Sequence, residues 1–372
     1  MGQGQIFKQR EMINFNKPHL TGKEAHYMYQ AVFNCKLSGN GDFTKKCQSF
    51  FEQRYGYKKA ILTTSGSDAL EMAAILCNIN PGDEVIVPSY TFVSSALAFV
   101  RERAKIVFAD SCANNPNIDP DKLEELITPK TKAIVVVHYA GIACDMDKIM
   151  DIAHRHGVLV VEDNAQGLDS FYKGRPLGSI GDLGCISFHE TKNITAGGEG
   201  GLLIVNDEQY TRRAEIIWEK GTNRAEFFRG MVNKYGWVDT GSSFLPSEVN
   251  AAFLLAQLEE LAPLAVKGYF TLPDIPGYAT NNAHMFYIVC RNIDERSALI
   301  SFLKDNGIQA CFHYLALHRS EYYTTHYTER PELPNCDRFA DCLVRMPMYY
   351  ELKEDEVKYI TDKIKAFYSD KQ

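Results

Sequence analysis

Short apolar runs alternate with amphipathic stretches along most of the first 260 residues of the chain. The runs are about four to eight residues long and are bounded by turn residues, which is typical of buried strands. Several are apolar at nearly every position, as expected for strands covered on both faces of a sheet. Strands are therefore predicted at 59–64, 84–88, 105–110, 133–138, 158–162, 184–189 and 201–205.

The stretches between these strands have the periodicity of helices. In the second predicted helix, large side chains recur at intervals that place them on one face, and they are expected in the core. Asp119 followed by Pro120 is a helix start, with a capping side chain and proline in the first turn, and predicts a helix to Ile127. The core face of the second helix comprises Phe43, Cys47, Phe50, Phe51 and Tyr55, and further helices are expected at 21–33, 68–77, 94–103, 146–156, 207–220 and 247–261.

The order of these elements predicts an α/β fold with a mostly parallel sheet and right-handed crossovers. The pattern changes near Pro263, Pro273 and Pro276, after which strands are expected at 284–291 and 309–313, a helix at 295–306, and two final helices ending near Tyr368. We therefore expect an N-terminal extension at 1–12, a large α/β domain at 13–262 and a smaller C-terminal α+β domain at 263–372. Ligands of such sheets bind beyond the carboxyl ends of the strands.

Composition narrows the class of protein. The 372 residues are 45% hydrophobic and 23% charged, as in ordinary globular proteins, and the net charge of −7 argues against nucleic acid or an anionic membrane as the main partner. No apolar run reaches the roughly 18 residues of a membrane span. The ten cysteines are scattered, with no C-x-x-C pair and no zinc spacing. A cytoplasmic protein without a metal site is expected.

A lysine and an aspartate that each follow a predicted strand are the first chemical signal. Asp163 ends the run at 158–162, and Lys192 follows the run that ends at Phe188. A lysine amine attacks an aldehyde only when it is unprotonated. Together the two residues suggest pyridoxal phosphate (PLP), with Lys192 holding the aldehyde and Asp163 pairing with the ring nitrogen. A lone lysine after a strand is more often a surface residue, so the assignment of Lys192 depends on the remaining motifs.

A phosphate site is indicated between the first strand and the helix after it. Residues 64–68 are small or polar and include Gly66, and a helix that starts there presents backbone N–H groups to an anion. The sequence contains neither G-x-x-x-x-G-K-[ST] nor G-x-G-x-x-G after a strand. Their absence counts against an NTPase and a Rossmann dehydrogenase.

Four motifs, in this order along the chain, resemble those of one family. The resemblance extends from about Ile13 to the C-terminus. The motifs are Ser65 to Leu70, Pro88 to Phe92, Glu162 to Gln166, and Ser187 to Asn193. Chains with these motifs resemble the DegT/DnrJ/EryC1/StrS family of sugar aminotransferases, which are PLP enzymes of fold type I, like aspartate aminotransferase. A narrower likeness, at 221–224, 227–230 and 239–244, is to members that make dTDP-4-amino-4,6-dideoxygalactose.

The resemblance implies a role for each matching residue. Lys192 would attach the cofactor and, once freed, carry the proton between cofactor and sugar carbons, while Asp163 would keep the ring nitrogen protonated. Phe92 would stack on the ring, and Gln166 would reach the ring hydroxyl. The phosphate would be bound by Gly66, Ser67 and Ser187, and by Ser243 of a neighbouring subunit, in a homodimer with shared active sites.

The resemblance also implies the substrates, a nucleotide-linked keto-sugar and L-glutamate. The expected reaction moves the amino group to C4 of dTDP-4-keto-6-deoxy-D-glucose, and its product would feed a surface polysaccharide. Arginine and lysine suit the oxygens of a diphosphate. The candidate substrate contacts are His189, Lys220, Arg229, His313 and His318.

Several alternatives stay open at this point. A sister aminotransferase would give the C4 epimer or act on a 3-keto sugar, and a PLP sugar dehydratase of the family would carry histidine in place of Lys192. An NAD-dependent sugar oxidoreductase lacks its glycine fingerprint here, and a non-catalytic binding protein would not need the Lys192–Asp163 pair. One departure stands out, because Pro263 shortens a helix that continues for further turns in the family. Either this chain has lost those turns, or the sequence omits a segment.

Overall fold

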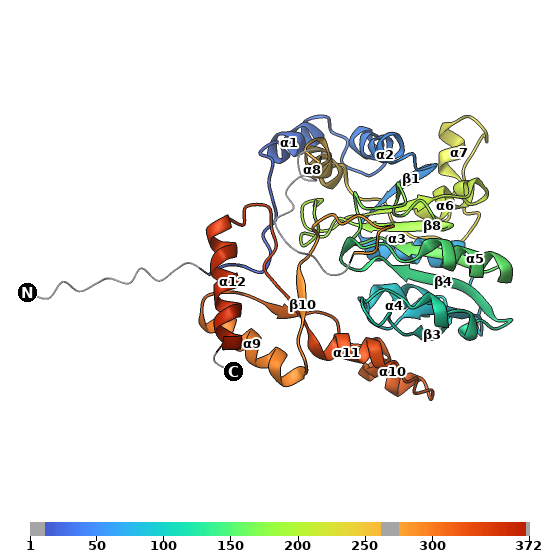
Figure 1. The fold of residues 1–372 in the computed structure, drawn as a ribbon. Helices are drawn as coiled ribbons and strands as arrows, with labels where there is room; N and C mark the ends of the chain where they lie inside the picture. The colour runs from blue at the N-terminus through green and yellow to red at the C-terminus, as the bar shows by residue number, and fades with distance from the viewer. Residues whose placement is uncertain (1–11, 262–274, 370–372) are drawn as a thin grey trace, which may run out of the picture.

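The computed structural model describes residues 12–261 and 275–369, which form a large and a small lobe (Figure 1). The large lobe is built on a seven-stranded sheet and the small lobe on a three-stranded one. The expected domain boundary at 262–263, the prolines Pro263 and Pro273, and residues 1–11 of the expected extension lie outside the described residues. Within the described ranges, no helix has both the length and the apolar character needed to cross a membrane.

The large sheet has the strand order β1-β9-β8-β5-β4-β2-β3, and its neighbours are parallel except where β9 pairs with β1 and β8. The parallel pairs are β2 with β3, β2 with β4, β4 with β5, and β5 with β8. The mostly parallel sheet predicted from the apolar runs is therefore confirmed. Its strands are β1 (Lys59–Thr63), β2 (Glu84–Pro88), β3 (Lys105–Ala109), β4 (Thr131–Val137), β5 (Leu159–Asp163), β8 (Leu183–Ser187) and β9 (Gly201–Val205).

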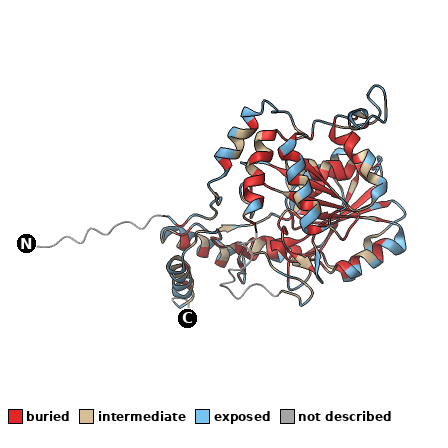
Figure 2. Cartoon of the chain, turned by 90° about the horizontal axis from the view of Figure 1, so that it is seen from above, coloured by how far each residue is buried: buried red, intermediate tan, exposed pale blue. Residues whose placement is uncertain are grey.

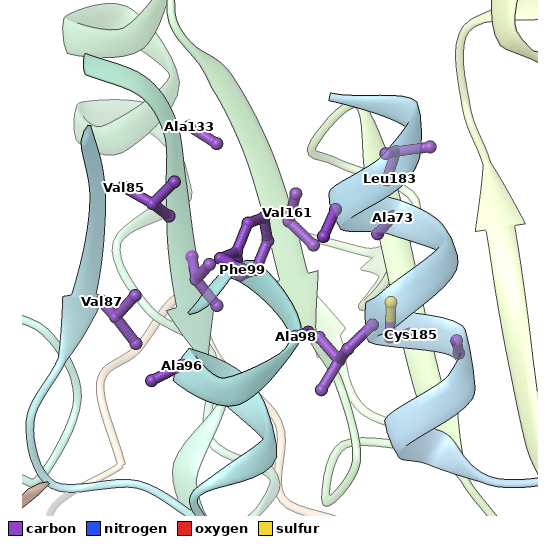
Figure 3. Packing of buried hydrophobic residues seen from close by; sticks show 14 of the residues in the cluster. Ala73, Val85, Val87, Ala96, Ala98, Phe99, Ala133, Val161, Leu183 and Cys185 are labelled. Carbon is purple, nitrogen blue, oxygen red and sulfur yellow. The ribbon is translucent and has the colours of Figure 1, made fainter. Parts of the chain in front are cut away.

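Helices cover both faces of this sheet, because side chains alternate between the faces along each strand. One face packs against α3 (Gly66–Leu76), α4 (Ser94–Arg101) and α6 (Thr211–Trp218), and Figure 3 shows Phe99 of α4 close to Val85 and Val161. The other face packs against α5 (Met146–His156), α2 (Asp42–Tyr55) and α8 (Glu248–Glu259). The sheet is buried and the outer sides of the helices are exposed (Figure 2). This double cover explains why the strands are apolar throughout.

Two local predictions had different outcomes. Helix α1 (Glu24–Phe33) begins as expected, with the Glu24 carboxylate accepting the N–H of Thr21 at 2.7 Å. The helix expected from Pro120 to Ile127 is instead two 3-10 turns, η1 (Pro120–Lys122) and η2 (Glu124–Leu126), although Asp119 still caps the first one. The segment is short, and Pro129 disfavours the helical conformation for the residue before it, so a regular α-helix does not form.

The small lobe has the strand order β10-β12-β11. The strand β12 and one of the three closing helices were not predicted, because the strand has three residues and follows a helix directly. Ile13, predicted to open the large domain, instead pairs with Ile308 and packs in the small-lobe core. The elements are β10 (Tyr287–Val289), α9 (Ile293–Asp305), β11 (Cys311–Phe312), η6 (Leu317–Arg319), α10 (Glu321–His326), α11 (Pro334–Cys342), β12 (Leu343–Arg345) and α12 (Glu354–Ser369).

The remaining elements lie in connections of the large lobe. Residues 219–243 form a long connection between α6 and α8. Backbone bridges from Glu219 to Ser243 and from Thr222 to Trp237 join its two arms. All ten cysteines lie in the described residues and are free thiols. The connections contain η3 (Tyr139–Gly141), β6 (Phe171–Tyr172), β7 (Arg175–Pro176), η4 (Glu208–Tyr210) and α7 (Arg224–Phe228).

Candidate active site

Lys192 and Asp163 come from neighbouring parallel strands whose carboxyl ends meet at one edge of the sheet. Asp163 is the last residue of β5 and is paired with Cys185 of β8. Lys192 lies in the loop between β8 and β9, where its N–H donates to the carbonyl of His189 at 2.9 Å. Burial lowers the pKa of the Lys192 amine, and the negative charge of Asp163 offsets part of this lowering. The fold therefore brings the two residues to the same edge of the sheet.

The Lys192 amine is prepared to react near neutral pH. Burial lowers its pKa to about 8, the positive charge of Arg345 adds to this effect, and Asp163 opposes it. With such a pKa, roughly a tenth of the amine is unprotonated at pH 7, against less than roughly a thousandth for an ordinary lysine. A free amine is the form that attacks an aldehyde.

Asp163 is a buried carboxylate with few hydrogen-bond donors. Its side chain is 5% exposed, and it accepts one bond from the Ser95 hydroxyl at 2.6 Å and one from the N–H of Ala165 at 3.2 Å. Burial raises the pKa of Asp163, and these two bonds together with Lys192 limit the rise. A buried carboxylate in this situation favours a further cationic donor. A protonated ring nitrogen is such a donor.

Three of the four predicted phosphate residues, Gly66, Ser67 and Ser187, lie where the start of α3 meets the end of β8. A Cβ atom on Gly66 would lie 2.7 Å from the Cβ of Ser187, so only glycine lets the first turn of α3 come this close to the end of β8. The Ser67 and Ser94 hydroxyls are 2.6 Å apart, and Ser65 caps the helix by accepting the N–H of Asp68. The first turn of a helix is suited to bind a phosphate through its backbone N–H groups.

Phe92 and Gln166 line the same region and differ in how many partners they have. The Phe92 side chain is 56% exposed, and its ring centroid lies 6.2 Å from that of Tyr314. The Gln166 amide is engaged at both ends, because it accepts the N–H of Ala140 at 2.7 Å and donates to the Tyr314 hydroxyl at 2.9 Å. Phe92 has an open face for a ring, whereas Gln166 would have to share a bond to reach a ring hydroxyl.

Two of the substrate candidates already have partners within the chain. His318 is 6% exposed, and its ring nitrogens lie 2.8 Å from the Ser89 hydroxyl and 3.4 Å from an Asp337 oxygen. Arg229 donates two hydrogen bonds to the Glu215 carboxylate, at 2.5 and 2.7 Å. These contacts favour a structural role for His318. Arg229 could bind substrate only if its ion pair with Glu215 opens.

The other predicted contacts are more accessible. His189 is half-buried, and its Nδ1 lies 2.9 Å from the Thr191 hydroxyl in the loop that carries Lys192. Lys220 and Ser243 are exposed at the two ends of the 219–243 segment. These ends lie side by side, because the Lys220 N–H donates to the carbonyl of Ser242 at 2.9 Å. His313 lies on the small-lobe side, with its Nδ1 2.5 Å from the Tyr139 hydroxyl. The charge of Lys192 helps to lower the pKa of His313.

Three residues of the site were not singled out from the sequence. Ser95 donates to Asp163, Tyr314 contacts Gln166, and Arg345 lowers the pKa of Lys192. Arg345 was not found because it ends β12, a three-residue strand that the sequence pattern did not predict. A charged residue between Val344 and Met346, in an otherwise apolar strand, was the available signal.

Comparisons with known proteins give the same assignment as the geometry. Residues 19–365 match the DegT/DnrJ/EryC1/StrS aminotransferase family. The chain belongs to this family. It is 31% identical to the spore coat polysaccharide biosynthesis protein SpsC of Bacillus subtilis, covering 97% of this chain and 98% of the relative. It is 30% identical to GDP-perosamine synthase of Escherichia coli O157:H7, with coverage of 95% and 98%.

Solved structures of similar chains agree with the fold. An aminotransferase from Psychrobacter cryohalolentis superposes with a TM-score of 0.87 at 27% identity, covering 95% of this chain and 98% of that one. Spr1654 from Streptococcus pneumoniae, in its PMP form, gives a TM-score of 0.85 at 25% identity, with the same coverage. The protein is a PLP-dependent sugar aminotransferase of fold type I. An NAD-dependent oxidoreductase and a non-catalytic binding protein, both left open by the sequence, are thereby set aside.

The residues present fit PLP. Bound PLP supplies a reactive aldehyde and a ring that withdraws electrons from the substrate carbon. Asp163 would hold positive charge on the ring nitrogen, and two opposite unit charges in contact attract by about 4 kcal/mol at an effective dielectric near 20. The Lys192 amine, with its lowered pKa, would hold the aldehyde and would take up and return a proton during the reaction. Gly66 lets the first turn of α3 pack against Ser187, and the backbone N–H groups of that turn and the hydroxyls of Ser67 and Ser187 would hold the phosphate.

Proposed function

We propose that this aminotransferase moves an amino group from L-glutamate to C4 of dTDP-4-keto-6-deoxy-D-glucose and so makes dTDP-4-amino-4,6-dideoxy-D-galactose. The observation that carries the amino transfer is the Lys192–Asp163 pair, with the pKa of the amine lowered to about 8. The choice of sugar is supported by the motifs at 221–224, 227–230 and 239–244, which resemble members that make this product.

The three substrate motifs form one feature of the fold, which supports a common role for them. All of their residues except Phe244 lie in the 219–243 segment, and the backbone bridges from Glu219 to Ser243 and from Thr222 to Trp237 hold it together. Lys220, at its base, is exposed and makes no ion pair within the described chain. It is therefore free to meet a diphosphate, whereas Arg229 is tied to Glu215.

A second candidate substrate is a GDP-linked keto-sugar. It is favoured by the 30% identity to GDP-perosamine synthase over nearly the whole chain. The C4 epimer of the proposed product and amination of a 3-keto sugar also remain candidate outcomes, because the motifs do not fix which face or carbon of the sugar is presented to Lys192. The experiment below separates these substrates and products.

We further propose that the enzyme acts in the cytoplasm as a homodimer and that Ser243 of each subunit reaches the phosphate site of the other. Apolar side chains on two parts of the surface support an interface. Tyr29, Val32 and Phe33 are exposed on α1, and in the 219–243 segment Phe228 is exposed and Trp237 is 85% exposed. Apolar groups gathered on a surface mark contact with a partner. SpsC, named for spore coat polysaccharide biosynthesis, supports a product destined for a surface polysaccharide.

The dimer and its shared site can be tested by mixing subunits. Light scattering should give the mass of two chains. Lys192→Ala and Ser243→Asp, each inactive alone, should regain activity when co-expressed, because one site of each mixed dimer keeps both natural residues. No recovery in a verified mixed dimer would place Ser243 outside the partner's site.

The reaction itself is tested by the visible absorbance of the purified protein. L-glutamate should bleach the yellow colour of bound PLP, and dTDP-4-keto-6-deoxy-D-glucose should restore it. The same protein is then offered the GDP-linked keto-sugar, and NMR of the product gives the carbon aminated and its configuration. Bleaching followed by recovery only with the GDP sugar would replace the proposed substrate by the second candidate. No bleaching would remove L-glutamate as the donor.

A further inference from the structure

The chain on the two sides of Lys192 is held in different ways. On the N-terminal side, the Lys192 N–H closes a turn by donating to the carbonyl of His189 at 2.9 Å. On the C-terminal side, Asn193 is followed by Ile194, which is 2% exposed and packs in the core. Asn193 therefore lies at the point where the loop that carries Lys192 enters the core, and its side chain is in a position to fix that point.

The Asn193 amide joins this loop to the segment that leads into β10 of the small lobe. Its Nδ2 donates to the carbonyl of Asn282 at 2.9 Å, and its Oδ1 lies 2.7 Å from His284 Nδ1. An amide oxygen accepts hydrogen bonds and cannot donate them, so the hydrogen of the imidazole is on Nδ1. Burial and the charge of Lys192 hold the pKa of His284 well below its usual range, and the ring is neutral. Both ends of the Asn193 amide are therefore engaged.

Asn282 attaches the same segment to the turn that follows β5. Its Nδ2 donates to the carbonyls of Gln166 at 2.8 Å and Leu168 at 2.7 Å, and its Oδ1 accepts the N–H of His284 at 3.1 Å. A Cβ atom on Gly141 would overlap this oxygen, so the Asn282 side chain fits closely against the large lobe. The hydrogen bonds thus link the loop between β8 and β9 with the turn after β5, and the proposed cofactor contacts come from both.

The reaction places two demands on the backbone beside Lys192. The amine must stay at one place in the site, and a misplacement of about 1 Å can cost about a hundredfold in rate. The amine must also stay buried, because burial is the largest cause of its low pKa. A loop that moved towards solvent would fail both demands, since a long side chain follows its backbone. Hydrogen bonds at the neighbouring Asn193 hold the backbone where both are met.

We propose that Asn193 and His284 are positioning residues for Lys192, and that the hydrogen donated by His284 Nδ1 to Asn193 is the contact that holds the loop in place. This inference rests on the proposed role of Lys192, but it does not depend on the sugar or on the amino donor. His284 Nε2 has no hydrogen-bond partner within the described residues, and the side chain is 8% exposed. A direct contact between Nε2 and a substrate is therefore the alternative that a test must separate from positioning.

The first test measures the Lys192 amine in the cofactor-free protein. Acetic anhydride labels only unprotonated amines, so mass spectrometry of the Lys192 peptide across a range of pH gives the pKa of that amine. The natural protein should give a midpoint at about 8. In Asn193→Ala the midpoint should rise by at least about one pH unit, because water reaches the amine. The charged groups that act on the amine are unchanged in this variant, and they are Asp163, Arg345 and Glu199.

The matched control is Asn281→Ala. Asn281 lies in the same segment, donates to the carbonyl of Ala140 at 3.3 Å and accepts the N–H of Ala283 at 2.7 Å. Within the described chain it makes no hydrogen bond to the loop that carries Lys192. The control should therefore leave the midpoint near 8, even if it lowers the thermal stability of the protein.

The second test separates the two ring nitrogens of His284. In His284→Asn the shorter amide places a donor near the position of Nδ1, whereas in His284→Gln the longer amide places one near Nε2. His284→Asn should therefore attach PLP at nearly the natural rate, and His284→Gln about a hundredfold more slowly. The mass of the protein with PLP attached, followed over time, measures the rate. The opposite order would mean that His284 acts through Nε2, and it would overturn the inference.

The outcomes distinguish this inference from the proposed function. An unchanged midpoint in Asn193→Ala, or an equal rise in Asn281→Ala, would overturn the inference and leave the function standing. If Asn193→Ala does not fold, the two His284 variants decide the inference. Attachment of PLP to another lysine would remove the role of Lys192 and the inference with it. If Lys192 holds PLP but neither L-glutamate nor a keto-sugar reacts, the proposed function fails. The labelling needs no substrate and still decides the inference.

Discussion

Two adjacent carboxylates at the end of β5 lie on opposite faces of the sheet and have opposite environments. Glu162 is buried, and its oxygens accept the N–H groups of Gly178 at 2.8 Å, Ile180 at 2.6 Å and Gly181 at 2.6 Å, and face His138 Nε2 at 2.9 Å. Asp163 is buried to a similar degree but receives only the Ser95 hydroxyl and one backbone N–H.

The two carboxyl groups shift in opposite directions as a result. Burial alone would raise the pKa of both. For Glu162, the hydrogen bonds from His138 and the backbone outweigh burial and lower its pKa, whereas the pKa of Asp163 stays raised. His138 accepts the N–H of Cys144 on Nδ1, so its Nε2 carries the hydrogen that Glu162 receives. The opposite pKa shifts of the two carboxyl groups are therefore explained by the number of hydrogen-bond donors around each, and not by burial. The well-supplied carboxylate holds the fold, and the poorly supplied one is available to a ligand.

The largest expected effect lies on the Asp163 side, at the amine that faces it. Lys192→Ala should lower the rate of amino transfer about ten-thousandfold or more, because both cofactor attachment and proton transfer are lost. Steady-state kinetics and the mass of the protein with PLP attached would measure this. Thermal unfolding of the cofactor-free variant should be little changed, since Lys192 is not needed for the core. Retention of covalent PLP at another lysine would contradict the assignment.

Asp163→Asn should lower the activity about a thousandfold while leaving the shape of the side chain nearly unchanged. The loss corresponds to the roughly 4 kcal/mol of charge pairing with the ring nitrogen. PLP should also dissociate more readily, which equilibrium dialysis would measure. The cofactor-free protein should unfold no more easily than before, because a buried charge with a raised pKa has been removed. A strongly destabilised Asp163→Asn protein would mean that Asp163 is also structural.

Glu162→Gln should lower the stability of the protein rather than its activity, the reverse of Asp163→Asn. The amide offers one acceptor oxygen in place of two and leaves a backbone N–H of the 178–181 turn without a partner. We expect the free energy of unfolding to fall by about 3 kcal/mol, as when one member of a buried pair is removed. Chemical denaturation of the cofactor-free protein would measure it. Wild-type stability together with lost activity would remove the distinction between the two carboxylates.

The sequence predicted the large lobe better than the small one, and the reason is physical. Strands buried on both faces give continuous apolar runs, so β2, β5 and β9 were expected close to their observed positions. The three-residue strand β12 leaves no such pattern. Its place depends on pairing with β10 and β11, which come from distant parts of the chain. Long-range pairing is not encoded in local periodicity.

The same contrast holds for the site. Asp163 and Lys192 follow strands directly, so an apolar run points to each of them, and the family motifs surround both. Ser95 lies within a helix, and its bond to Asp163 joins residues 68 positions apart. Arg345 becomes significant only when the small lobe is packed against the large one. Residues whose roles depend on another element were not predictable from their own surroundings.

The pH dependence of cofactor attachment should report the environment of Lys192. Below pH 8 the rate should fall about tenfold per pH unit, because the protonated amine does not attack, and above pH 8 it should level off. The lowered pKa of Lys192 also makes the stability of the protein depend on pH. The folded protein gives up this proton near pH 8 and the unfolded chain near 10.5, so the free energy of unfolding rises with pH between the two values. Stopped-flow absorbance during PLP uptake would give the midpoint. A midpoint near 10 would mean that burial does not act on the amine as described.

The smallest effect is expected from the donor that Asp163 does have. Ser95→Ala removes a 2.6 Å hydrogen bond to the carboxylate, so the pKa of Asp163 should rise further and PLP should bind about tenfold more weakly. Equilibrium dialysis against PLP would measure the change. Thr91→Val is the matched control, because the Thr91 hydroxyl contacts Ser95 at 2.8 Å and has no hydrogen bond to Asp163. It should leave PLP binding unchanged.

Combining Ser95→Ala with Asp163→Asn makes this last prediction specific. If Ser95 acts only through the charge of Asp163, its removal should cost little once that charge is gone, and the two effects on PLP affinity should not add. Additive effects would show that Ser95 contributes to PLP binding by another route, such as the packing of α4 against the sheet. In that case the supply of donors would not explain why Asp163, rather than Glu162, is the carboxylate available to a ligand.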